Sequence, residues 1–252
     1  LASRVKNHNP DTILYVVDKR QALHFKQVIS AAKVSQLVYN TSPEHVPFGT
    51  INGEGGRPFK TRDGGTMRLW DLLELMQSKA AKRITERSKD IDVNLISETV
   101  AMAAIKYGEL SHDRENDYTF DPEAFLQFEG NTGPYLLYTS VRTTSLLNRA
   151  KENGIKPGTV KSIDRHARNI VLIMDMFSDT LQRVIEHRKP SILAAHLYSL
   201  ASEMNVFYQK NPVLAKGVIS ETAQSRLRVL EVADKQLRVG LTLLGIIVPE
   251  KM

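Results

Sequence analysis

The sequence predicts an α/β portion followed by an all-α portion, and three observations carry this prediction. Residues 12–17, TILYVV, form a short apolar run of β-branched and aromatic residues that ends at the polar Asp18, as expected for a buried parallel strand. Residues 21–33 follow with apolar side chains on one helical face, so strand and helix make a βα unit. Past Gly65 the apolar spacing changes from period two to period 3.6, and from residue 126 onward almost every stretch is typical of amphipathic helix.

The α/β portion is expected to hold the late strands of a doubly wound parallel sheet. Further strands are predicted at residues 36–39 and around 48–51. Such sheets bind ligands at the C-terminal ends of their strands, which directs attention to Gln21 and His24 just after the first strand. A lone histidine on a helix is more often a surface or structurally bonded imidazole, and that alternative stays open.

The helical portion is expected to be a bundle. A helix carrying Leu69 and Leu72 is followed by one that carries Ile96 and ends with Gly108 as its cap. The later helices are predicted at residues 134–152, 164–187, 191–208 and 220–244, the third with Pro190 in its first turn. The last helix needs partners, because apolar residues form one stripe along it: Leu227, Leu230, Ala233, Leu237, Leu241 and Leu244.

Composition excludes several classes of protein. The 252 residues contain no cysteine, which rules out disulfides, cysteine nucleophiles and thiolate metal sites and is consistent with a reducing cytoplasm. No apolar run approaches the roughly 20 residues of a membrane helix, so a soluble protein with no membrane partner is expected. No paired histidines or nucleophile elbow appear, so no metal site is predicted. The net charge of +6 is as compatible with a polyanionic partner as with none.

A glycine-rich segment, NGEGGRPFKTRDGG at residues 52–65, is the strongest chemical signal. Its glycines allow backbone N–H groups to approach a phosphate, while Lys60 and Arg62 can neutralise charge that grows during nucleotidyl chemistry. It is not a Walker A loop. An exposed hairpin with solvated cations explains the segment equally well.

A second signal lies at the start of the helix predicted from residue 134. Tyr135 and Tyr138 are three residues apart and precede Arg142, so two rings and a guanidinium can share a face on which RNA bases stack. The alternative is that both tyrosines are core residues. Residues 142–168 hold seven basic residues, Arg149 among them, against two acidic ones, a local charge of +5.

Six blocks together resemble the arginyl-tRNA synthetase family across essentially the whole chain: YVVDKRQALHF, HVPFG, RPFKTRDGGTMRL, IKYGELSHDRENDYTFD, FEGNTGPYLLYTSVR and LTLLGIIVPEKM. The resemblance implies that residues 1–110 are the C-terminal part of a class I, Rossmann-type catalytic domain and that residues 111–252 are a helical anticodon-binding domain. It implies ligation of arginine to tRNA through an arginyl-adenylate, with ATP and Mg²⁺, no tightly bound cofactor and a monomeric, cytoplasmic protein.

The resemblance also implies roles for individual residues. Gln21 would hold the substrate arginine, His24 would lie beside the nucleotide, and Phe48 and Gly49 would approach adenine. Lys60 would take the place of the lysines of the KMSKS loop, as a catalytic and ATP-binding residue. Arg62 is the second catalytic candidate. For tRNA the resemblance contributes three candidates of its own and the spacing three more: Asn131, Tyr135 and Met252 from the family, and Tyr138, Arg142 and Arg149 from the pattern.

One departure from the family pattern concerns the first residue. The HIGH motif and the tyrosine and aspartate that complete the arginine pocket belong upstream of Leu1, so the chain is expected to be a fragment that cannot form arginyl-adenylate alone. Two other functions are kept as alternatives. One is a non-catalytic tRNA-binding or RNA-binding module derived from a synthetase, and the other is a nucleotide-binding regulatory protein with a helical interaction domain.

Overall fold

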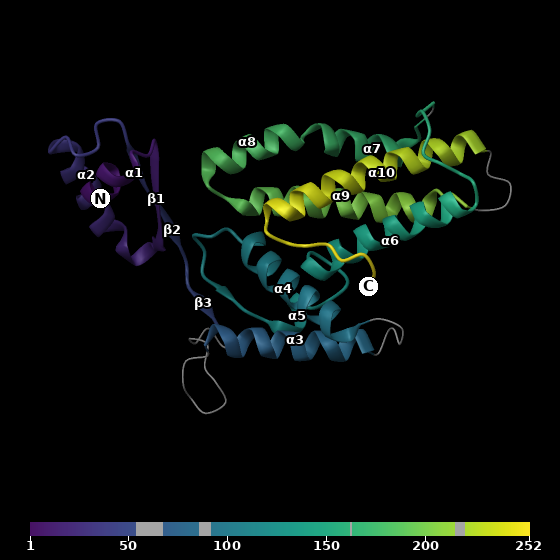
Figure 1. Ribbon diagram of the computed structural model, residues 1–252, viewed down its shortest axis with the longest axis horizontal. Coiled ribbons are helices and arrows are strands. Elements are labelled where there is room, and N and C mark those ends of the chain that lie inside the picture. The colour runs from purple at the N-terminus through teal and green to yellow at the C-terminus, as the bar shows by residue number, and fades with distance from the viewer. Residues whose placement is uncertain (54–67, 86–91, 162, 215–219) are drawn as a thin grey trace. The chain divides into compact units, whose positions relative to one another are not determined.

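The computed structural model describes residues 1–53, 68–85, 92–161, 163–214 and 220–252, which divide into two compact units (Figure 1). Unit 1 comprises Leu1–Gly64 and His112–Phe120, and unit 2 comprises Gly65–Ser111 and Asp121–Met252. Each unit is a group of residues that contact one another more than they contact the rest of the chain. The predicted boundary between residues 110 and 111 separates two domains of the family, and it stays a prediction.

Unit 1 is an α/β unit built around parallel strand pairs. Its elements are α1 (Ala2–His8), β1 (Thr12–Asp18), the 3-10 turn η1 (Lys19–Gln21), α2 (Ala22–Val34), β2 (Ser42–Phe48), β3 (Ile51–Asn52) and β4 (Tyr118–Thr119). β1 pairs with β2, and β3 with β4. Helix α2 packs on the first pair through Phe25, whose ring stacks on His45 at 4.9 Å between centroids and lies 5.0 Å from that of Tyr15. The predicted βα unit at residues 12–33 is confirmed.

The strand predicted at residues 36–39 is wrong. That segment is a turn in which Gln36 has a left-handed φ of 56°, and the strand follows as β2, SPEHVPF. Proline normally disfavours a strand because it lacks an N–H. The Ser42 N–H donates to the Asp11 carbonyl oxygen, so N–H groups of the even-numbered residues point toward β1 and the nitrogens of Pro43 and Pro47 point away from it. Both prolines are therefore tolerated.

Unit 2 is helical, as predicted. Its helices are α3 (Leu69–Thr85), α4 (Val93–Ser111), α5 (Pro122–Phe125), α6 (Gly133–Glu152), α7 (Arg165–Asp175), α8 (Phe177–His187), α9 (Pro190–Lys210) and α10 (Ser220–Leu243). Helix α9 packs against α4, α6, α7, α8 and α10 (Figure 1). The six residues of the predicted α10 stripe are all buried. Pro190 is the first residue of α9.

Two helix predictions need correction. The helix expected at residues 164–187 is divided at Met176 into α7 and α8. Gly108 does not cap α4, which continues to Ser111. A Cβ at Gly108 would lie 2.2 Å from the Phe125 ring, so this glycine permits close packing of α4 against α5.

Candidate functional site

The C-terminal end of β1 is shaped by Asp18. Its carboxylate accepts hydrogen bonds from the Arg20 backbone N–H at 2.8 Å and from the guanidinium Nε and Nη2 at 2.9 and 2.6 Å. The side-chain bonds from Arg20, followed by the backbone bond, lower the pKa of Asp18 to about 2. Asp18 is thus a carboxylate cap that turns the chain from β1 into η1. Gln21 and His24 follow this turn and are both exposed.

Phe48 and Gly49 lie at the same end of the strand pair, because the parallel register pairs Asp18 with Phe48. Phe48 is 39% exposed and can offer its ring to a ligand. Gly49 is differently engaged. Its N–H donates to the Arg114 carbonyl oxygen at 2.6 Å, and a Cβ there would lie 2.3 Å from the Asn116 carbonyl oxygen, so glycine is required for this contact.

Residues 112–120 contact the segment that follows β2, at the same end of the strand pair. The sequence analysis did not predict this contact. Asp117 accepts from the Thr50 N–H at 2.6 Å and from Lys19 Nζ at 3.0 Å. These bonds, the Thr50 backbone bond first, lower the pKa of Asp117 below its usual range. A signal was available in the block IKYGELSHDRENDYTFD, which resembles the family pattern but had no role assigned to it.

Four of the predicted residues therefore lie at one edge of unit 1, at or just beyond the C-terminal ends of β1 and β2: Gln21, His24, Phe48 and Gly49. An amide, an imidazole and a ring face can bind a polar group and a flat base without any catalytic carboxylate. Lys60 and Arg62 lie outside the described residues, so their relation to this edge is left as predicted.

Helices α6 and α9 form a second candidate site, which we call the α6–α9 seam and define by Tyr135, Tyr138, Arg142, Arg149, Tyr198, Asn205 and Tyr208. Thr132 caps α6 by accepting from the Tyr135 N–H at 3.3 Å, which fixes where the helix begins. The half-buried Tyr135 ring lies 5.9 Å from that of Tyr198, and its hydroxyl accepts from Asn205 Nδ2 at 3.1 Å. Tyr135 is thus part of the seam and also joins α6 to α9.

The arginines of the seam converge on a ring that sequence reasoning missed. The Arg142 guanidinium lies over the Tyr208 ring, 3.7 Å from its centroid, and Arg149 Nη2 donates to the Tyr208 hydroxyl at 3.5 Å. A guanidinium over the face of an aromatic ring is held there by cation–π attraction, and Arg142 stays partly exposed. Tyr138 is 41% exposed and makes no hydrogen bond within the described ranges. The spacing 198, 205, 208 along α9 could have revealed one stripe.

Two further predicted residues lie apart from the seam contacts. Asn131 precedes the α6 cap, and its Oδ1 accepts from the Tyr107 hydroxyl at 2.6 Å; burial raises the pKa of that hydroxyl. Met252 is half-buried in the segment after α10, a segment tied to α4 where Lys106 Nζ donates to the Gly245 carbonyl oxygen.

The described residues offer little support for two other classes of site. Within the ranges that the structure covers, no three His, Asp or Glu side chains are grouped so that they could hold a metal ion. Over the same ranges no helix is both long and apolar enough to cross a membrane.

Comparison with known families gives two consecutive matches. The family described as "tRNA synthetases class I (R), catalytic domain" matches residues 1–122, and the family "DALR anticodon binding domain" matches residues 136–252. Together they account for nearly the entire chain, in the order catalytic then anticodon-binding.

Individual relatives agree with these matches. The chain is 42% identical to the arginine–tRNA ligase of Hyphomonas neptunium over 96% of its own length, and 40% identical to that of Maricaulis maris over 100%. It spans only 42% and 44% of those relatives. Among solved structures, arginyl-tRNA synthetase of Thermus thermophilus superposes with a TM-score of 0.83 at 25% identity, over 96% of this chain and 41% of that one.

Proposed function

We propose that this chain, which belongs to the arginyl-tRNA synthetase family, provides the tRNA-binding helices and part of the catalytic domain of an ATP-dependent arginine–tRNA ligase. In that reaction the carboxylate of arginine attacks the α-phosphate of ATP to give arginyl-adenylate and release pyrophosphate. A ribose hydroxyl of the tRNA then attacks the acyl carbon of the adenylate, which forms the arginyl ester and releases AMP. The observation that carries the proposal is the pair of family matches over residues 1–122 and 136–252. Proposed partners are tRNA, ATP with Mg²⁺ and L-arginine, for a monomeric cytoplasmic enzyme.

The edge of unit 1 supports a role in holding arginine and ATP. Gln21 is exposed just beyond the Asp18 turn, where a neutral amide can accept from the substrate guanidinium. His24 and Phe48 lie at the same edge for the nucleotide. Because the Gly49 N–H is already bonded to Arg114, we assign to Gly49 a close backbone approach rather than a free donor for adenine.

The catalytic part of the proposal is tested by ATP–pyrophosphate exchange. These 252 residues contain no HIGH motif, so the chain alone is expected to show no arginine-dependent exchange. Robust exchange by the chain alone would refute this expectation. In the full-length enzyme, Lys60→Ala should lower adenylation by about 10²-fold while leaving tRNA affinity nearly unchanged, since one transition-state cation is lost. An unaltered rate would remove Lys60 from the site.

The α6–α9 seam supports the tRNA-binding part. Its two arginines supply positive charge, and an unpaired base can stack on the outer face of the Arg142 guanidinium, which Tyr208 supports from beneath. The exposed Tyr138 ring offers a second stacking surface on the same helix. Asn131 and Met252 remain proposed tRNA contacts on the resemblance alone.

Graded variants of Tyr208 test this role. Tyr208→Ala should weaken tRNA binding about tenfold or more, because the platform for Arg142 is lost. Tyr208→Phe keeps the ring and should bind nearly as well as the parent chain. Arg142→Gln should weaken binding and lower the slope of log Kd against log salt by about 0.7 to 0.9.

The matched control is Arg168→Gln, which removes the same charge from α7 outside the seam. Arg168 is exposed, and its side chain makes no hydrogen bond or ion pair in the described residues. If Arg168→Gln weakened tRNA binding as much as Arg142→Gln, general charge rather than the seam would explain the binding. Fluorescence anisotropy of labelled tRNA at several salt concentrations measures both quantities.

A further inference from the structure

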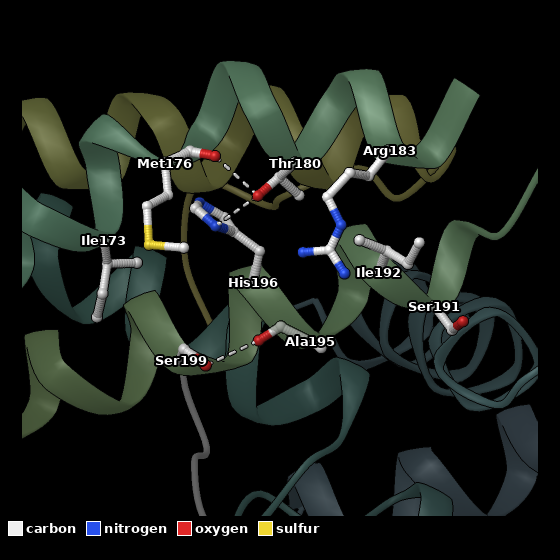
Figure 2. A pocket seen from close by; sticks show the side chains of 9 residues that line it. All are labelled: Ile173, Met176, Thr180, Arg183, Ser191, Ile192, Ala195, His196 and Ser199. Atoms are coloured by element: carbon white, nitrogen blue, oxygen red, sulfur yellow. Dashed lines mark hydrogen bonds between the residues drawn. The ribbon is translucent and has the colours of Figure 1, made fainter. Parts of the chain in front are cut away.

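A pocket of about 460 Å³ opens between α8 and α9 near the break at Met176 (Figure 2). One wall comes from Ile173, at the end of α7, and from Met176, and the facing surface comes from Ile192 and Ala195 of α9. Pockets that hold small molecules have this size, with mostly apolar walls and a few polar groups. None of its lining residues belongs to the α6–α9 seam or to the edge of unit 1.

The pocket contains one permanently charged group. Figure 2 shows the Arg183 guanidinium extending from α8 toward Ile192 and His196. In the part of the chain that the structure describes, Arg183 makes no hydrogen bond or ion pair, and Asp179, one helical turn earlier, does not pair with it. An unpaired planar guanidinium beside an apolar wall is well suited to binding a carboxylate through two parallel hydrogen bonds.

His196 closes the inner end of the pocket without adding a second charge. Its Nδ1 lies 3.3 Å from the Thr180 hydroxyl and its Nε2 lies 3.4 Å from Gln236 Oε1. Gln236 is itself fixed by donating from Nε2 to the Met174 carbonyl oxygen at 3.0 Å. Burial lowers the pKa of His196, with the Gln236 bond opposing the shift, so the imidazole is neutral at neutral pH. The pocket therefore presents a single positive charge.

We propose that this pocket binds a small monocarboxylate with an apolar chain or ring, its carboxylate on Arg183 and its apolar part against Ile173, Met176 and Ile192. Charge complementarity selects this ligand class. A nucleotide or free phosphate carries more negative charge than one guanidinium neutralises, and a neutral hydrocarbon would leave Arg183 unused. The site is additional to the proposed ligase function and does not depend on it.

Octanoate is a suitable probe, and the methyl group of Met176, a residue that is 57% exposed, is a suitable reporter. In the full chain labelled with ¹³C-methyl methionine, the Met176 signal is identified by its loss in Met176→Leu. Titration with octanoate should shift that signal saturably, with a Kd on the order of 1 mM for a ligand of this size. Octanol and inorganic phosphate are titrated in parallel.

Variants separate the carboxylate contact from general apolar binding. Arg183→Gln should weaken octanoate binding about tenfold, as expected for losing a charge-assisted contact, and should leave octanol binding unchanged. Arg168→Gln, the matched control outside the pocket, should bind octanoate like the parent chain. Ala195→Phe should fill the groove and abolish binding of both probes while the circular dichroism spectrum stays native.

Several outcomes would overturn the proposal. Equal affinity for octanoate and octanol, or unchanged octanoate binding in Arg183→Gln, would show that Arg183 does not bind the carboxylate. A shift of the Met176 signal by phosphate alone, or no shift at an octanoate concentration about ten times the expected Kd, would also refute the proposal. A Met176 signal that responds only to an acidic partner peptide would identify a protein-docking groove instead. None of these results bears on ligation or tRNA binding, so failure here is distinguishable from failure of the proposed function.

Discussion

Asp234 is a buried carboxylate that joins α10 to α6, the helix that carries most of the seam. Its Oδ1 accepts from the Ser140 hydroxyl at 2.5 Å and its Oδ2 accepts from Arg238 Nε at 2.8 Å. Arg238 in turn donates from Nη2 to the Thr144 hydroxyl on α6 at 2.8 Å. Only 8% of the Asp234 side chain is exposed, so water cannot take over the hydrogen bonds that Ser140 and Arg238 donate to its carboxylate.

Replacing Asp234 with alanine leaves a buried hydroxyl without its acceptor and a guanidinium without its counter-charge. Breaking a buried ion pair costs about 3 to 5 kcal/mol. Because the Arg238 side chain is 33% exposed and can be rehydrated, we expect the lower end, about 3 kcal/mol, for Asp234→Ala. Ser140→Ala removes one hydrogen bond to a charged group and should cost about 1.5 kcal/mol.

Urea unfolding followed by far-UV circular dichroism measures these costs, because α3 to α10 all lie in unit 2 and dominate the signal. The double variant should cost at least about 0.5 kcal/mol less than the sum of the single changes, since both remove one shared bond. Ser145→Ala, the same change on the exposed face of α6, should stay within about 0.5 kcal/mol of the parent. A loss below about 1 kcal/mol for Asp234→Ala would refute the view that this network holds α10 to α6.

Three other predictions concern single positions. Gly133→Ala should destabilise unit 2 by about 3 kcal/mol in the same assay, because a Cβ there would lie 2.2 Å from the backbone carbonyl oxygen of Ala103. His196 has a lowered pKa when folded, so the unfolded chain binds more protons as the pH falls below the ordinary value of 6.5; unfolding free energy should drop on acidification, and less so in His196→Gln. NMR titration should give Asp18 a pKa of about 2, rising toward 3.8 in Arg20→Gln.

Periodicity predicted the helices well where one face is buried and the other is not. The α10 stripe and the first residue of α9 are confirmed because three- and four-residue spacing and a first-turn proline are local signals. The break at Met176 escaped prediction, because α7 and α8 each continue the amphipathic pattern and no glycine or proline marks the junction.

Errors arose where a tertiary contact decides the role of a residue. Gly108 is a reasonable helix cap by sequence, and only the Phe125 ring packed on it explains a glycine inside α4. Pro43 and Pro47 make a strand at residues 42–48 hard to predict, and only the register with β1, which points their nitrogens away from that strand, explains why β2 forms. Tyr208 was missed for the same reason, since its partners Arg142 and Arg149 are more than fifty positions away in sequence.

Tyr135 shows why a loss of tRNA affinity in Tyr135→Ala would be ambiguous by itself. The side chain faces the seam, yet its hydroxyl and ring are engaged by Asn205 and Tyr198 of α9, so alanine would also loosen α6 from α9. Asn205→Ala separates the two causes, because it removes the support for Tyr135 and Thr139 and leaves the ring in place. If Tyr135 contacts RNA directly, Asn205→Ala should lower unfolding free energy by about 1 kcal/mol and change tRNA affinity far less than Tyr135→Ala does. Equal losses of affinity in the two variants would make Tyr135 a positioning residue for the seam.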